Sequence, residues 1–357
     1  MGDPVFRLPS SVFLVLFGDL MNMIWFWALG AMLIAYAVLD GYDLGVGTIS
    51  LWLTRTNEER RTALNAIGPV WNGNEVWLLA AGGMLVVSFP RVYAVGFSGF
   101  YLALMVVLWL LILRGVSIEF RHQIGHPMWH ALWDAGFWFG SALISLLLGV
   151  ALGNVLHGLP LGAEGSFEGT FTLMLNPYSL LTGILSLAVL AWHGTTFLRT
   201  KTEGELLDRV RRWSMVLWWA AAALVVLTTA ATFVLRPTLV DNYWAHPIAW
   251  LLPITALAGL VVGLLCRSEA RDRLAFLAST VTIVALLGSA AASVYPNLLM
   301  STISPEYSLT IYNAASSPHA LLTAFIANIF GMIGVIVYST YVHRTFSGKV
   351  RVGEPGY

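Results

Sequence analysis

Long runs of apolar residues dominate this sequence and limit what it can fold into. The first run extends from Val12 to Leu53, and further runs of similar character follow along the whole chain. A membrane helix needs about 20 mostly apolar residues, and helices satisfy their own backbone groups in lipid. Charged residues make up 11% of the chain, against roughly 25% in a soluble domain. The sequence therefore predicts an all-α membrane protein.

The first run is too long for one span, since its 42 residues would measure about 63 Å as a helix. We expect a break near Asp19, which leaves a short interfacial helix over residues 8–20. The chain then reads as one membrane domain over 1–357, with an interfacial segment (1–21), a nine-helix bundle (22–343) and a tail (344–357). The nine predicted spans are 22–50, 65–89, 93–114, 132–153, 177–198, 213–235, 247–266, 273–295 and 319–343.

Lys and Arg fall unevenly between the two sets of loops. Sixteen of the nineteen follow the first, third, fifth and seventh spans or lie in the C-terminal tail. Only Arg7, Arg91 and Arg236 fall on the other side. Because basic loops are retained in the cytoplasm, the N-terminus is predicted outside and the C-terminus inside. This split supports the count of nine spans.

Composition argues against several other classes of protein. The formal net charge is zero, so nothing indicates a nucleic-acid partner. A single cysteine, Cys266, excludes an internal disulfide, a CxxC redox pair and a CxxCH haem attachment site. The N-terminus lacks the small-residue cleavage site of a secretory signal peptide.

Three carboxylates interrupt the first two spans. Asp40 and Asp43 are three residues apart and share one helix face, and Glu75 lies in the second span. Acids within a membrane helix usually face the protein interior and serve a function. Gly41 and Gly45 form a small-xxx-small pair, which allows a neighbouring helix to approach closely.

The predicted depths of these acids suggest a path for protons. Asp40 lies about 27 Å from the outer end of its span and Glu75 about 15 Å from the cytoplasmic end of its own. Cytoplasmic acids would then lead to an acid near the midplane. The spacing also places Trp71, Asn72 and Glu75 on one side of the second span.

A structural role is the alternative for each of these acids. Asp40 and Asp43 would then pair with basic residues near the cytoplasmic interface, and a hydrogen bond to Asn or Trp would hold Glu75. The basic residues in reach of that interface are Arg55, Arg60 and Arg61.

Haem-bearing membrane cytochromes need a His, Met or Cys ligand inside the bundle. Of eight histidines, only His193 lies well within a predicted span, and an isolated buried His is more often hydrogen-bonded than a ligand. We therefore expect no cofactor held by this chain alone. A haem-binding chain that uses His193 and His319 remains an alternative, as does a proton-coupled secondary transporter.

Several long motifs, in order, resemble subunit II of the cytochrome bd quinol oxidases. The likeness is dense over residues 30–125 and thinner beyond. The motifs are GYDLGVG, NAIGPVWNGNEVWLLAAGG, FPRVYAVGFSGFYLAL, LRGVSIEFR, GNVLHGLP (153–160), LNPYSLLTG (175–183), YPNLLMS (295–301) and SLTIYNAASS (308–317).

The resemblance implies a nine-span protein of two four-helix bundles plus one peripheral helix. It implies a partner, subunit I, that carries haems b and d and the quinol-oxidising site, in a complex that reduces dioxygen to water. Subunit II would contribute assembly, part of a cytoplasmic proton route and, in some members, an oxygen path. A small single-helix accessory subunit and a bound quinone or lipid are further expectations. The location implied is a bacterial or archaeal cytoplasmic membrane.

The resemblance also assigns roles to single residues. Asp40 and Asp43 match the paired acids of the first span, and Trp77, with Trp71 nearby, matches a position near the oxygen path. Some members have Asp at the position of Asn72 and Gln at that of Glu75. We infer that the titratable group has moved by about one helical turn. Arg114, Glu119 and Arg121 match a family motif, which an interfacial salt-bridge cluster explains equally well.

Overall fold

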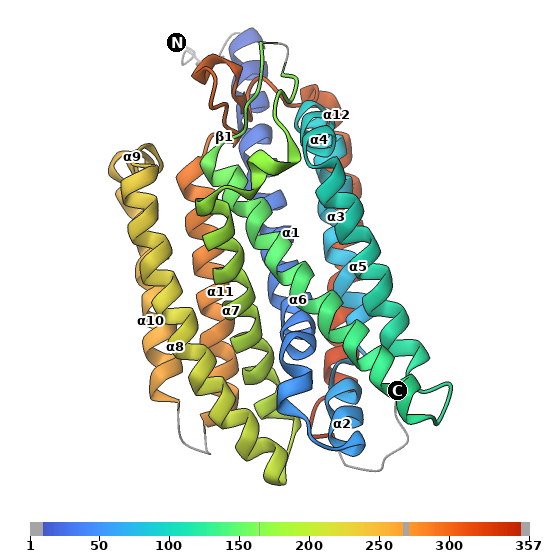
Figure 1. The fold of residues 1–357 in the computed structure, drawn as a ribbon. Coiled ribbons are helices and arrows are strands. Elements are labelled where there is room, and N and C mark those ends of the chain that lie inside the picture. Colours follow the sequence, from blue (N-terminus) through green and yellow to red (C-terminus); the bar gives the residue numbers. More distant parts are fainter. Residues whose placement is uncertain (1–9, 164, 267–270, 351–357) are drawn as a thin grey trace, which may run out of the picture.

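The computed structural model describes residues 10–163, 165–266 and 271–350. The chain is almost wholly helical, and its long helices run side by side (Figure 1). The helices are α1 (Ser10–Leu53), α2 (Asn57–Ile67), α3 (Trp71–Ser88), α4 (Pro90–Gly99), α5 (Tyr101–Phe120), α6 (Pro127–His157), α7 (Pro177–Lys201), α8 (Gly204–Leu235), α9 (Thr238–Ala245), α10 (Leu251–Leu265), α11 (Asp272–Val294) and α12 (Pro318–Thr345).

Short elements complete the described chain. A two-stranded antiparallel sheet pairs β1 (Asn297–Leu299) with β2 (Leu309–Thr310). The 3-10 helices are η1 (Phe171–Leu175), η2 (Pro247–Trp250) and η4 (Pro305–Tyr307).

Polar caps followed by proline begin several long helices. Asn176 accepts a hydrogen bond from the Ser179 amide at the start of α7, and Ser317 accepts one from Ala320 at the start of α12. The next residue in each case is proline, whose missing N–H is no loss in the first helical turn. These capping residues fix the positions at which α7 and α12 begin.

Eight helices, among the residues that the structure describes, are long and apolar enough to cross a membrane. They are α1, α5, α6, α7, α8, α10 with η2, α11 and α12. The chain is therefore an all-α, multi-pass membrane protein. The remaining predicted span corresponds to α3, whose first turn carries Asn72, Asn74 and Glu75. The count of nine and the orientation in the membrane stay predictions.

Two expected helix boundaries are wrong. The chain does not break near Asp19, because α1 continues from Ser10 to Leu53 and contains no proline to interrupt it. Residues 1–9 of the expected interfacial segment lie outside the described part. The second span does not begin near residue 65, because Gly68 ends α2 and α3 starts only at Trp71, after Pro69.

The helices form two groups around α1 and α7. The helices α3 and α6 pack on one side of α1 and α5 packs on α6, while α8, α10 and α11 lie with α7 on the other side (Figure 1). Helix α12 packs against α1 and α3. All residues from 40 to 49 and from 189 to 199 are buried, so at this level both central helices are enclosed on every side.

Glycines bring the two central helices into backbone contact. A Cβ on Gly45 would lie 1.9 Å from the Leu190 carbonyl oxygen, and one on Gly41 would lie 2.9 Å from the Leu190 side chain. A Cβ on Gly194 of α7 would in turn meet the backbone of Gly45 at 2.3 Å. The small-xxx-small pair of α1 thus packs against a glycine of α7, the arrangement typical of close membrane-helix crossings.

Candidate functional site

Two carboxylates share one guanidinium at the centre of the first helix group. Arg114 of α5 donates from Nη1 to Asp40 Oδ2 at 3.0 Å and from Nη2 to Asp40 Oδ1 at 2.8 Å. Nη2 also donates to Glu75 Oε1. The side chains of Asp40 and Arg114 are fully buried, whereas that of Glu75 is 25% exposed. A bidentate ion pair thus joins α1 to α5, and the additional contact between Arg114 and Glu75 joins α5 to α3.

Asp43 lies beside this trio without a cation of its own. Its Oδ2 accepts a hydrogen bond from Asn74 Nδ2 at 2.7 Å, and its Oδ1 is buried with no hydrogen bond. Among the described residues no Lys, Arg or His forms an ion pair with it. A buried carboxylate without a counter-charge is costly, so this carboxyl favours a bound proton.

A hydrogen-bonded chain connects Asp43 to the far end of α12. Asn74 Nδ2 lies 2.9 Å from Tyr42 Oη, and Tyr42 Oη lies 3.0 Å from His343 Nε2. Because His343 Nδ1 donates to the Ser339 carbonyl at 2.8 Å, a neutral ring leaves Nε2 to accept from the tyrosine hydroxyl. His343 is half-buried, in the last turn of α12. The chain therefore reaches the end predicted to face the cytoplasm.

The predicted separation in depth between Asp40 and Glu75 is wrong. Both carboxylates contact the same Arg114 guanidinium, so they lie at one level. The reason is the turn at Pro69, which makes α2 a separate helix and leaves Glu75 only four residues from the start of α3.

The residues expected near Glu75 divide between the surface and the interior. Asn72 is exposed on this chain, and Asn74, which the sequence reasoning did not single out, makes the buried contacts instead. Trp71 packs against Gly115 of α5, and Trp77 belongs to the apolar cluster that includes α1 residues between Met21 and Tyr36. These contacts support a packing role for both tryptophans, and an oxygen path beside them stays a prediction.

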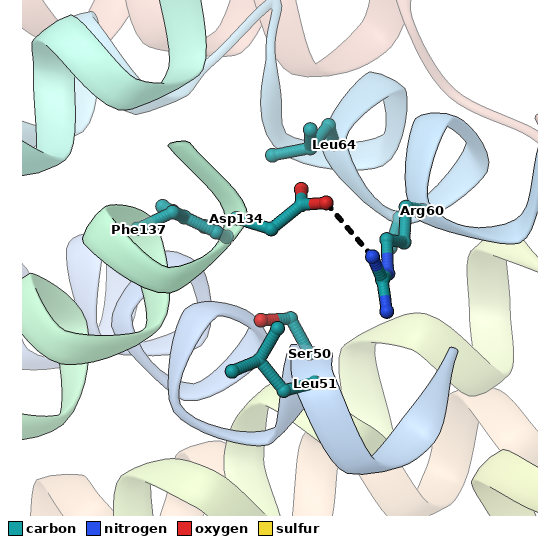
Figure 2. Close-up of a pocket in the computed structure, with 7 residues that line it drawn as sticks. Ser50, Leu51, Arg60, Leu64, Asp134 and Phe137 are labelled. Atoms are coloured by element: carbon teal, nitrogen blue, oxygen red, sulfur yellow. Dashed lines mark hydrogen bonds and ion pairs between the residues drawn. The ribbon is translucent and has the colours of Figure 1, made fainter. Parts of the chain in front are cut away.

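A second ionic cluster holds Arg60, one of the three arginines proposed as alternative partners of Asp40 and Asp43. Arg60 donates to Asp134 at 2.9 Å, and Arg121 contacts the same carboxylate at 2.6 Å. Figure 2 shows Arg60 and Asp134 facing each other beside a cavity of about 10 Å³, close to the smallest space that holds a water. Pairing of Asp40 with Arg60 is therefore wrong.

His193 is engaged through both ring nitrogens. Nε2 lies 3.0 Å from the Val38 carbonyl oxygen, and Nδ1 lies 2.7 Å from Ser279 Oγ. In this arrangement neither nitrogen is free to bind a haem iron, so the residues present do not fit the haem-binding alternative. His319 begins α12, at the opposite end from the last turns of α7 that hold His193.

The central role of Arg114 was not predicted from the sequence, in which Arg114 was placed at the cytoplasmic interface. An arginine inside the twenty-residue apolar helix α5 was a usable signal, because such a cation requires a buried acid. No local signal indicated Tyr42 or His343, which are 301 residues apart in the chain.

Known proteins resemble this chain along nearly its whole length. The model of the family described as cytochrome bd terminal oxidase subunit II matches residues 21–346. A probable cytochrome oxidase subunit 2 of Haemophilus influenzae is 33% identical and covers 92% of this chain and 94% of its own. The cytochrome bd-I ubiquinol oxidase subunit 2 of Escherichia coli is 31% identical, with coverages of 93% and 96%.

A solved structure shares the fold. A chain in the structure of bd oxidase from Geobacillus thermodenitrificans matches with a TM-score of 0.74 and 20% identity, over 91% of this chain and 98% of that chain.

Proposed function

Since this chain belongs to the family of cytochrome bd terminal oxidase subunit II, a subunit of a quinol-oxidising oxidoreductase complex in the bacterial cytoplasmic membrane, we propose that its buried acid cluster supplies protons to that complex. The route runs from the cytoplasmic end through Asp43, Asp40 and Glu75 toward subunit I. By the same resemblance, haems b and d and the quinol site belong to subunit I. The alternative interpretation as a secondary transporter is not favoured.

The observation that carries this proposal is a mismatch of charges. Asp40, Asp43 and Glu75 provide three carboxyl groups, and Arg114 is the only cation that forms an ion pair with any of them among the described residues. Full ionisation would leave two negative charges uncompensated in a largely buried site, which is unfavourable. The cluster therefore tends to hold protons that it can release and take up again, as a relay must.

The hydrogen-bonded chain from His343 supports a cytoplasmic source for these protons. His is the side chain whose charge changes nearest neutral pH, and His343 is half-buried at the end of α12. Tyr42 Oη bridges His343 to the Asn74 amide, which holds Asp43 Oδ2. An amide does not itself relay protons, so Asn74 positions the two oxygen groups, and the transfer passes between Tyr42 and Asp43.

The exposed side of α3 supports a docking face for subunit I. Asn72 is exposed and Glu75 partly so, and polar groups at membrane depth need protein or water around them. Gly73 contacts Tyr338 of α12, and Trp71 contacts Gly115 of α5, so α3 lies between these two helices. Helix α12 is the least buried of the eight spans. We assign the face formed by α5, α3 and α12 to subunit I.

The acid nearest that face provides the test. In the purified two-subunit complex, Glu75→Gln is expected to lower oxygen consumption and proton uptake at least about tenfold, since a positioned proton-transfer group typically contributes more than that. Glu205→Gln is the matched control, because Glu205 is an exposed carboxylate in the first turn of α8, away from that face. Unchanged rates in Glu75→Gln, with normal haem content, would exclude Glu75 as the relay.

A further inference from the structure

A cavity of about 210 Å³ opens where α6 ends and α7 begins, at the end of the molecule that is predicted to face outward. Apolar side chains of the 158–176 loop form part of its wall, and His157, Asn176 and Thr302 add polar groups. A single water needs only about 10–15 Å³ of such space, so the cavity accepts a considerably larger chemical group.

Arg236 lies beside this cavity, next to its lining residue Gly158. It follows the last residue of α8, and its Nη2 lies 3.6 Å from where a Cβ on the cavity residue Gly158 would be. Its Nε is buried with no hydrogen bond, and none of the ion pairs found within the described ranges includes Arg236. Burial lowers the pKa of Arg236, as expected for a cation held partly out of water.

Two further polar residues, His157 and Thr302, line the cavity near Gly158. His157 Nδ1 is buried without a hydrogen bond and lies at the cavity wall. A Cβ at Gly158, whose φ is +90°, would lie 3.0 Å from the Thr302 methyl group and 3.6 Å from Arg236 Nη2, so both side chains border this glycine. A side chain at Gly158 would therefore fill the space that these groups surround.

We propose that this cavity binds a phosphate group. A guanidinium and an imidazole together match the oxygens of a phosphate, and arginine binds such oxygens in a bidentate manner. Glu168, a carboxylate of the same loop, is exposed and makes no ion pair with Arg236. The site thus has positive charge to offer an anion.

The location suits the headgroup of a phospholipid, and free phosphate shares the same chemistry. Val234 and Leu235, next to Arg236, are 78% and 55% exposed at the end of a membrane-spanning helix. An acyl chain would lie along these residues while the phosphate entered the cavity.

The test uses the purified two-subunit complex in a neutral detergent. Native mass spectrometry measures binding of short-chain phosphatidylglycerol against diacylglycerol, which lacks the phosphate. In a second arm, thermal midpoints are compared in sodium phosphate and in sodium chloride of equal ionic strength. The variants are Arg236→Gln, Arg236→Lys and, as the control, Arg91→Gln, whose arginine lies at the same end and already donates to the Asn313 carbonyl.

We expect Arg236→Gln to lower the affinity for phosphatidylglycerol at least about tenfold, which is the usual effect of losing a charged hydrogen-bond donor. Arg236→Lys should fall between it and the wild type, and Arg91→Gln should match the wild type. Stabilisation by phosphate with the same variant dependence, but without a lipid preference, supports free phosphate as the ligand. Equal binding of both probes by wild type and Arg236→Gln would overturn the site.

Discussion

Replacing Arg114 by glutamine removes the guanidinium that Asp40 and Glu75 share. Asp40 loses a bidentate pair at 2.8 and 3.0 Å, and Glu75 loses its contact to Nη2. Both carboxylates then face Asp43 with no cation among them. Replacing Asp40 by asparagine is a smaller change, because Arg114 keeps Glu75 as its partner.

The expected losses in the free energy of unfolding follow from the burial of these ion pairs. Removing one member of a fully buried ion pair destabilises a protein by about 3–5 kcal/mol, because the other charge is left uncompensated, and Arg114→Gln belongs at the upper end of that range. Asp40→Asn loses charged hydrogen bonds worth about 1.5–3 kcal/mol. The double variant should be about 2 kcal/mol less stable than Asp40→Asn, because only one carboxylate, the partly exposed Glu75, is then stranded.

The assay is a double-mutant cycle on the purified complex, with unfolding free energies from graded detergent denaturation. We expect a coupling energy of about 3 kcal/mol, at the high end for residues in contact. The ratio of haem to protein after purification reports assembly in each variant. As a matched control, Arg91→Gln removes an arginine that contacts only a backbone carbonyl.

Two outcomes would refute this reasoning. If Asp40→Asn destabilises the complex as much as Arg114→Gln, Arg114 does not hold a second carboxylate. If the two single effects simply add in the double variant, the ion pair contributes nothing that is specific to the pair.

Two further predictions concern the proton path and the partner face. Tyr42→Phe keeps the ring stacked on Phe197 at 4.1 Å but removes the hydroxyl, so proton uptake should slow at least about tenfold at normal haem content; an unchanged rate would exclude this path. A cysteine at Phe330, which is 72% exposed on α12, should crosslink to subunit I, whereas one at Leu257 of α10 should not. The reverse pattern would place the interface with subunit I at α10 and would contradict the proposed face. Cys266 is fully buried and should not interfere.

The sequence alone shows that this protein folds in a lipid bilayer. It also shows which acids and glycines are unusual in membrane helices. Apolar runs require membrane helices because hydrocarbon offers the backbone no hydrogen-bond partners. The acids Asp40, Asp43 and Glu75 stood out because charge is rare at such depth. Gly41 and Gly45 indicated a close helix contact, since residues four apart share a face.

Only the tertiary structure decided which of these residues contact one another. The sequence gives the faces of each helix, but which faces meet depends on packing between distant segments. Asp40 and Arg114 are 74 residues apart, so no local pattern joins them. The turn at Pro69 shifts α3 along its axis, which brings Glu75 level with Asp40 and turns Asn74, in place of Asn72, toward Asp43. The periodicity of one helix cannot predict which of its residues meet another helix. The rotation and depth of a membrane helix are set by its neighbours.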